Sequence, residues 1–136
     1  MHEVVTEVEV RRARPADAPA LARLERQIYR EQRWFVGDGA PSEGMLAQRI
    51  RNAEPEQTLW LVACSGPDLL GWLELHRFPA SRLRHVATLT IAVERAARGQ
   101  GVGKRLLHTS YEWARTVGVG KISLNVRAGN EAAIGL

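Results

Sequence analysis

The segment Arg98–Lys104, RGQGVGK, has glycine at alternate positions, two basic side chains and almost no apolar surface. A helical pattern begins within it, at Val102. Glycine lets a chain adopt positive φ and approach a ligand closely. Backbone N–H groups at the start of a helix converge on an anion, and the helix dipole adds to the attraction. The segment therefore predicts an anion-binding loop whose donors run from Gly99 to Lys104.

Spacing excludes two common phosphate-binding loops. A nucleotide-triphosphate loop, G-x-x-x-x-G-K-[ST], would need glycine at Arg98 and a hydroxyl side chain at Arg105. A dinucleotide loop, G-x-G-x-x-G, would need its third glycine at Lys104, Leu106 or Ser123, depending on where it starts. Neither pattern is present, so another kind of phosphate group is the expected ligand.

The pattern that does fit is [QR]-x-x-G-x-[GA], present as Arg98–Gly103 after a strand that ends in IAV. With its flanks, the stretch His85–Leu136 resembles the GCN5-related N-acetyltransferase (GNAT) superfamily. The residues upstream are compatible with the order of elements in that family. The resemblance implies an α/β (mixed α+β) fold over residues 1–136. Its sheet would be mostly antiparallel with splayed middle strands and flanking helices, and its C-terminal strands would be missing.

The resemblance implies acetyl-CoA as cofactor. Its pyrophosphate would lie on the backbone of Gly99, Gln100, Gly101, Val102, Gly103 and Lys104, with added attraction from the charges of Arg98 and Lys104. The pantetheine arm would pair with the backbone of Ile91, Ala92 and Val93, and an N–H of Ala92 or Val93 would stabilise the oxyanion. Asn130 matches a family asparagine near the thioester, and it also suits the N-cap of the helix that follows.

The activity that the resemblance implies is direct transfer of acetyl to a primary amine of a small molecule, an amino acid or a protein N-terminus. The alternative is a non-catalytic acetyl-CoA-binding or regulatory module of the same fold. At neutral pH the acceptor amine is mostly protonated, so a base must remove a proton. Some relatives have a glutamate at the position of Ala87, which leaves Glu74 and His85 as nearby base candidates. Each of these also suits a purely structural role.

The C-terminus departs from the family pattern. The family tyrosine that protonates the leaving thiolate would follow Leu136, where this sequence stops. One or two strands that usually cover the edge of Lys121–Val126 are also absent, and an uncovered edge invites pairing. Three explanations stay open: a truncated chain, a second subunit that completes the sheet as in a homodimer, or an omitted tail.

The elements that must position these residues are read from hydrophobic periodicity. Strands are predicted at Thr6–Arg12, Thr58–Cys64, Leu69–His76, His85–Val93 and Lys121–Val126. Three full helices are predicted: the first has Asp17 as its N-cap, the second has Ser42 as its N-cap and ends at about Arg51, and the third runs from Val102 to Val117 with Gly118 at its end. A further helix begins at Asn130.

Composition narrows the class of protein. The 136 residues suit one domain, with 45% hydrophobic and 25% charged residues. The net charge is +4, but the arginines are spread along the chain and the tryptophans lie in apolar contexts, which argues against nucleic-acid binding. Cys64 is expected in the core, and His2, His76 and His108 lack metal-ligand spacing. Without a signal-peptide pattern or an apolar span, we expect a cytoplasmic protein with no membrane contact.

Overall fold

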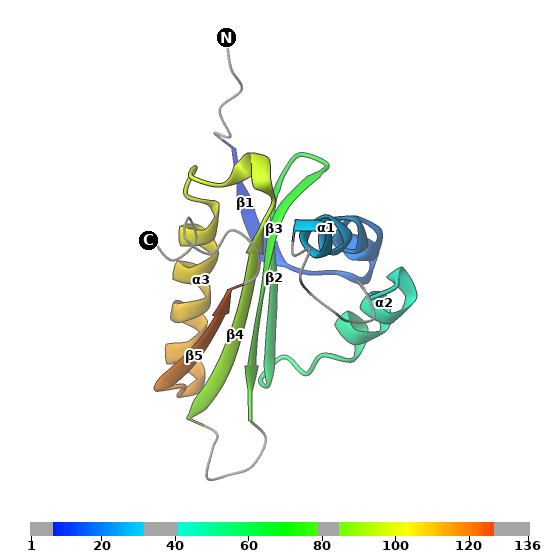
Figure 1. Ribbon diagram of the computed structural model, residues 1–136. Coiled ribbons are helices and arrows are strands. Elements are labelled where there is room, and N and C mark those ends of the chain that lie inside the picture. The colour runs from blue at the N-terminus through cyan, green and yellow to red at the C-terminus, as the bar shows by residue number, and fades with distance from the viewer. Residues whose placement is uncertain (1–6, 32–40, 79–84, 127–136) are drawn as a thin grey trace.

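The protein is built on a mixed β-sheet with helices on both faces (Figure 1). The computed structural model describes residues 7–31, 41–78 and 85–126. The strands lie in the order β1 (Glu9–Arg12), β2 (Thr58–Ser65), β3 (Asp68–Arg77), β4 (Val86–Val93) and β5 (Lys121–Val126). Neighbouring strands are antiparallel except β4 and β5, which run parallel. The mostly antiparallel sheet predicted from the sequence is confirmed.

Helix α3 (Val102–Val117) covers one face of the sheet, and helices α1 (Ala18–Glu31) and α2 (Glu43–Asn52) cover the other (Figure 1). Neighbouring side chains of a strand point to opposite faces, so the sheet separates two cores. The core under α3 contains Leu61, Leu73, Leu89 and Leu106. The core under α1 and α2 contains Leu21, Ile28, Trp60 and Trp72. Helix α3 also makes the crossover that a parallel β4–β5 pair requires.

Strands β2 and β3 form a hairpin that carries a bulge. Its tight turn places Gly66 at φ +59°, a conformation that favours glycine. Cys64 then pairs with Leu69 whereas Ala63 pairs with Gly71, so Leu70 is the extra residue. The carbonyl of Leu70 accepts the N–H of Glu94 at 2.7 Å. The bulge thereby holds the residue at which β4 passes into the glycine loop.

Gly71, which the sequence did not single out, lets β3 and β4 approach each other closely. A Cβ atom at this position would lie 2.8 Å from the carbonyl oxygen of Ala92 and 3.4 Å from Leu106 Cδ1. Real Cβ atoms essentially never come within 3.0 Å of such an oxygen. Glycine at this position therefore sets the separation of the two strands next to the end of β4.

The helix boundaries confirm two predicted caps and correct a third. Ser42 Oγ accepts the N–H of Met45 at 3.2 Å at the start of α2, and Gly118 ends α3 at φ +87°. Asp17, however, is not the N-cap of α1. It is the last residue of a 3-10 turn that leads directly into the helix, and its carboxylate accepts the N–H of Arg14 at 2.7 Å. A capping carboxylate can serve a preceding turn as well as a helix start, so its type and position did not distinguish the two.

A further difference concerns β1, which begins at Glu9 rather than Thr6. Glu7 and Val8 precede the strand, and the Val8 carbonyl accepts a hydrogen bond from Arg105 Nη1 of α3. This contact ties the entry of the first strand to the helix that follows the glycine loop.

A bidentate ion pair connects β1 to the residue before α1. Arg11 Nη1 and Nη2 each donate to the Asp17 carboxylate at 2.8 Å. The two side chains are 21% and 12% exposed, respectively, so water screens the pair only in part. The hydrogen bonds from Arg11 lower the pKa of Asp17, although burial opposes them, and the carboxylate raises the pKa of Arg11.

We expect Asp17→Asn to lower the free energy of unfolding by about 2 kcal/mol at pH 7, the scale of hydrogen bonds to charged groups. The folded-state pKa lies below the unfolded-state value of about 3.9, so the contribution is present above that value and is lost as pH falls through the folded-state pKa. Urea unfolding of both proteins from neutral to strongly acidic pH should show a difference that shrinks below about pH 4. Asp68→Asn, at an exposed position, is the control. A difference that does not change with pH would contradict this account.

Candidate active site

The glycine loop lies between the end of β4 and the start of α3. After Val93 the chain makes a short 3-10 turn, Arg95–Ala97, and α3 begins at Val102. Gly99 and Gly101 have φ values of +80° and +84°, and a Cβ atom at either would meet no atom within 4 Å. Glycine is needed at these two positions for its backbone conformation and not for packing, because any other residue would be strained there.

The first amides of α3 are available to a ligand. The N-cap residue is Gly101, which has no side chain to satisfy them, and the first helical bond runs from Arg105 N–H to the Gly101 carbonyl at 3.1 Å. The N–H groups of Val102, Gly103 and Lys104 therefore have no partner within the helix. Amides in this arrangement, together with the positive end of the helix dipole, can bind an anion such as the pyrophosphate expected from the resemblance.

The basic side chains of the loop have different surroundings. Arg98 Nε donates to the carbonyl of Val93 at 2.9 Å, so this side chain links the loop to the last residue of β4. Lys104 is exposed in the first turn of α3, where its charge adds to the positive potential. Gln100 is also exposed, and its side chain donates to the Ala96 carbonyl at 3.2 Å. Arg98 and Lys104, the two predicted sources of positive charge, thus lie at the two ends of the glycine loop. Arg98 also has a structural contact with the end of β4.

The end of β4 presents a backbone donor on the side of β5. The register between β4 and β5 runs to Ile91↔Val126, the last pair in the described ranges. Glu94 N–H bonds to β3 through Leu70, and backbone groups alternate sides along a strand. The backbone N–H of Ala92 therefore also points toward β3, whereas the N–H groups of Ile91 and Val93 point toward the β5 side. Of the two oxyanion donors expected, this geometry favours Val93. Asn130 lies outside the described residues.

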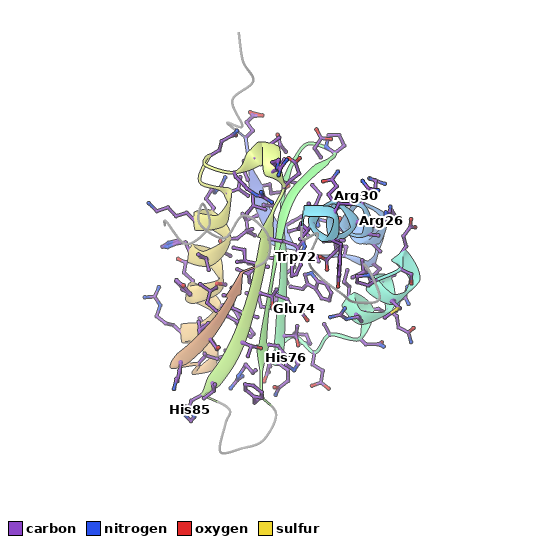
Figure 2. All side chains as sticks on the ribbon, viewed as in Figure 1. Arg26, Arg30, Trp72, Glu74, His76 and His85 are labelled. Atoms are coloured by element: carbon purple, nitrogen blue, oxygen red, sulfur yellow. The ribbon has the colours of Figure 1, made fainter. Side chains whose placement is uncertain are left out.

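Two rows of side chains cross the sheet on the face of α1 and α2. The register gives them as Trp60–Glu74–Thr90 and Thr58–His76–Thr88. Figure 2 shows Glu74 and His76 following Trp72 along β3 on this side of the sheet. Ala87, where a glutamate was considered, is fully buried in the opposite core under α3. Alternate residues of β4, among them Thr88, Thr90 and Ala92, face α1 and α2 instead.

Glu74 and His76 line an open cavity of about 620 Å³ between α2 and the sheet. The Glu74 side chain is 23% exposed, and its Oε1 lies 3.6 Å from Arg49 Nη2 of α2. The Arg49 guanidinium lies over the Trp60 ring, 5.3 Å from the ring centroid. His76 Nδ1 shares a hydrogen bond of 2.8 Å with Thr58 Oγ1. The volume is in the range of small-molecule sites, and the lining mixes one carboxylate, one guanidinium and one imidazole.

The sequence matches the acetyltransferase (GNAT) family over residues 20–136. The chain belongs to the GNAT superfamily. Among similar proteins is the N-alpha-acetyltransferase RimI of Mycobacterium tuberculosis, 32% identical over 121 residues, which are 89% of this chain and 69% of RimI. A ribosomal-protein-alanine N-acetyltransferase from Brucella melitensis is 27% identical with a TM-score of 0.78, covering 93% of this chain and 79% of the other. The yncA protein of Salmonella typhimurium, solved with its cofactor acetyl-CoA, shares the fold with a TM-score of 0.79 at 18% identity, over 94% and 75% of the two chains.

The two base candidates, Glu74 and His85, lie at different distances from the end of β4. Glu74 pairs with Thr90, three residues before Val93, or about 10 Å along the strand. His85 precedes the other end of β4, about 25 Å from Val93, and is exposed (Figure 2). Its carbonyl accepts the N–H groups of Gly120 and Lys121 at 2.8 and 3.0 Å. This placement favours Glu74 as the base and gives the His85 backbone a structural role at the start of β5.

Among the described residues that line this cavity, sequence reasoning named only Glu74 as a site candidate. Of the residues that it missed, three matter most to the chemistry: Arg49, Trp60 and His76. His76 had a usable signal, because it follows Glu74 at a spacing of two on a predicted strand and so shares its face. Arg49 and Trp60 had none, since their contact depends on how α2 packs against β2.

The described residues give no sign of a metal centre or a membrane span. In residues 7–31, 41–78 and 85–126, no three His, Cys, Asp or Glu side chains are grouped so as to hold a metal ion. Among the helices of the same ranges, none combines the length and apolar character that crossing a membrane requires.

Proposed function

We propose that this chain transfers the acetyl group of acetyl-CoA to a primary amine of a small molecule, an amino acid or a protein N-terminus. The observation that carries the proposal is the uncapped start of α3, with Gly99 and Gly101 at positive φ, beside the end of β4. The names of the similar proteins, RimI and the Brucella enzyme, support N-acetylation. The yncA structure with acetyl-CoA supports the cofactor.

The loop residues would hold the pyrophosphate through the amides of Gly99 to Lys104. The N–H of Val93, on the β5 side of β4, would donate to the cofactor arm or to the acetyl oxygen. When bound, acetyl-CoA supplies an acetyl group on a thioester, which an amine attacks more readily than an amide. The positions of these donors follow from backbone conformation, so they are in place before any ligand binds.

Glu74 would accept the proton of the acceptor amine. An alkyl amine with a pKa of about 10.4 is almost fully protonated at pH 7 and has no lone pair for attack. Glu74 lines the cavity and lies on the same face as Thr90, a short way along the sheet from Val93. A carboxylate in this position can take the proton directly or through one water molecule. His76, held by Thr58, lies in the next row and is a second polar contact for the same amine.

Thermal unfolding with acetyl-CoA, with ATP as the control anion, tests the cofactor assignment. A ligand at 100 times its Kd adds about 2.7 kcal/mol to the free energy of unfolding, which should raise Tm by several degrees. We expect this shift with acetyl-CoA and none with ATP. Release of CoA thiol with a panel of amines then tests turnover. Stabilisation without turnover on any amine would indicate a binding module, and the absence of any shift would refute the assignment of the loop.

A further inference from the structure

The ion pair in the cavity uses only part of the hydrogen-bonding capacity of its two members. The contact joins Arg49 Nη2 to Glu74 Oε1 at 3.6 Å, which is longer than a hydrogen bond. No hydrogen bond to another described residue engages the rest of the Arg49 guanidinium or Glu74 Oε2. Both side chains line the cavity and are partly exposed, 49% and 23%, respectively. The Arg49 guanidinium and the Glu74 carboxylate are thus adjacent in the cavity, and both have hydrogen-bonding groups that a ligand can use.

The Trp60 ring restricts the guanidinium of Arg49. The distance of 5.3 Å from the guanidinium carbon to the ring centroid is within the range of cation–π contacts. Trp60 itself is only 6% exposed, so the surface on which the guanidinium lies is fixed by the core. A guanidinium held in this way loses little conformational entropy when it binds, and its planar fork matches a carboxylate.

We propose that Arg49 is a specificity-determining residue that binds a carboxylate of the acceptor, close to the amine that Glu74 receives. The inference rests on the proposed function and narrows its substrate class. The acceptor would carry a carboxylate a few bonds from the amine. The ammonium would contact Glu74 and the carboxylate Arg49, so that four charges of alternating sign surround one another. An acceptor with an amine alone would leave Arg49 with no added partner.

Two sources can supply this chemistry, and paired ligands distinguish them. A free α-amino acid has its own carboxylate, and its amide derivative lacks it. A peptide that begins with aspartate has a side-chain carboxylate, and the asparagine peptide lacks it. Thiol release gives kcat/KM for each pair. We expect the member with the carboxylate to be preferred by about 10- to 100-fold in one of the two pairs, the scale of a hydrogen bond between charged groups.

Variants of Arg49 assign the preference to this residue. Arg49→Gln should bring the preferred pair close to equality, and Arg49→Lys should restore little of it, since an ammonium has no planar fork. Arg51→Gln, on the same helix but outside the cavity lining, is the matched control and should leave the preference unchanged. A preference that persists in Arg49→Gln, or no preference in either pair of the unmutated protein, would overturn the proposal.

A binding measurement separates this inference from the proposed function. Because Arg49 lies on Trp60, a carboxylate ligand should change the tryptophan fluorescence of the unmutated protein, and the change should be lost in both Trp60→Phe and Arg49→Gln. Failure of the proposed function would leave this carboxylate-dependent signal intact while no amine is acetylated. Failure of the inference would abolish the signal while acetyl-CoA still stabilises the protein and amines are acetylated without regard to a carboxylate.

Discussion

Replacing Glu74 with glutamine is expected to lower kcat by about 10²- to 10⁴-fold, the usual contribution of a general base. Glutamine has a similar shape but cannot accept a proton from an ammonium group. Glu74 is the carboxylate of the cavity, which contains no other acidic residue in its described lining. The residual rate should rise as pH increases, because a growing fraction of the amine is then unprotonated without help. Rates of thiol release from pH 6 to 10 measure both effects.

The substitution should leave the fold and the cofactor site unchanged. The ion pair with Arg49 is long and partly exposed, so its loss should cost less than about 1 kcal/mol of stability. The shift in Tm caused by acetyl-CoA should equal that of the unmutated protein, since the loop lies at the end of the neighbouring strand. Glu112→Gln, on the exposed face of α3, is the matched control. If kcat of Glu74→Gln equals that of the control, another residue takes the proton.

Gly101→Ala is expected to remove most of the stabilisation by acetyl-CoA. Alanine at φ +84° is strained by about 1–2 kcal/mol, which the loop can relieve only by turning the peptide away from its present direction. The amides that follow Gly101 would then no longer point to one place. Thermal unfolding with and without acetyl-CoA measures the loss of the shift.

A glycine at the other end of the same helix provides the control. Gly118 has φ +87° and, like Gly101, has open space where a Cβ atom would lie. Gly118→Ala should therefore lower the stability of the ligand-free protein by a similar amount but keep the full acetyl-CoA shift. Equal losses of the shift in both variants would show that strain in α3, and not the direction of the loop amides, weakens binding.

The glycine loop and most elements could be predicted because their signals are local. Gly101 precedes an amphipathic helix and Gly118 follows it, and both positions demand positive φ for reasons contained within a few residues. Ser42 caps α2 through a hydrogen bond to a residue three positions away. Such short-range requirements can be recognised without knowing what the element packs against.

The cavity could not be predicted because its members meet only in the folded protein. Arg49 and Trp60 belong to separate elements, and nothing in their spacing indicates that a guanidinium should lie on an indole ring. The preference for Glu74 over His85 likewise depends on strand register. Glu74 pairs with a residue of β4 and His85 directly precedes β4, so the sequence alone does not show which of them lies nearer to Val93. The face on which Ala87 lies also depends on register, because a shift of one residue turns a side chain to the other side of the sheet.

The contact between Arg98 and Val93 has a consequence for which acyl carriers the site can use. The backbone of Arg98 belongs to the glycine loop and its side chain is bonded to the end of β4, so the loop and the strand end cannot move apart independently. Under the proposed function, the distance between the anion-binding amides and the Val93 N–H is therefore constant. A carrier must have an arm of matching length between its phosphates and its thioester to reach both ends at once. Arg98 would thus select the cofactor by its length as well as by its charge.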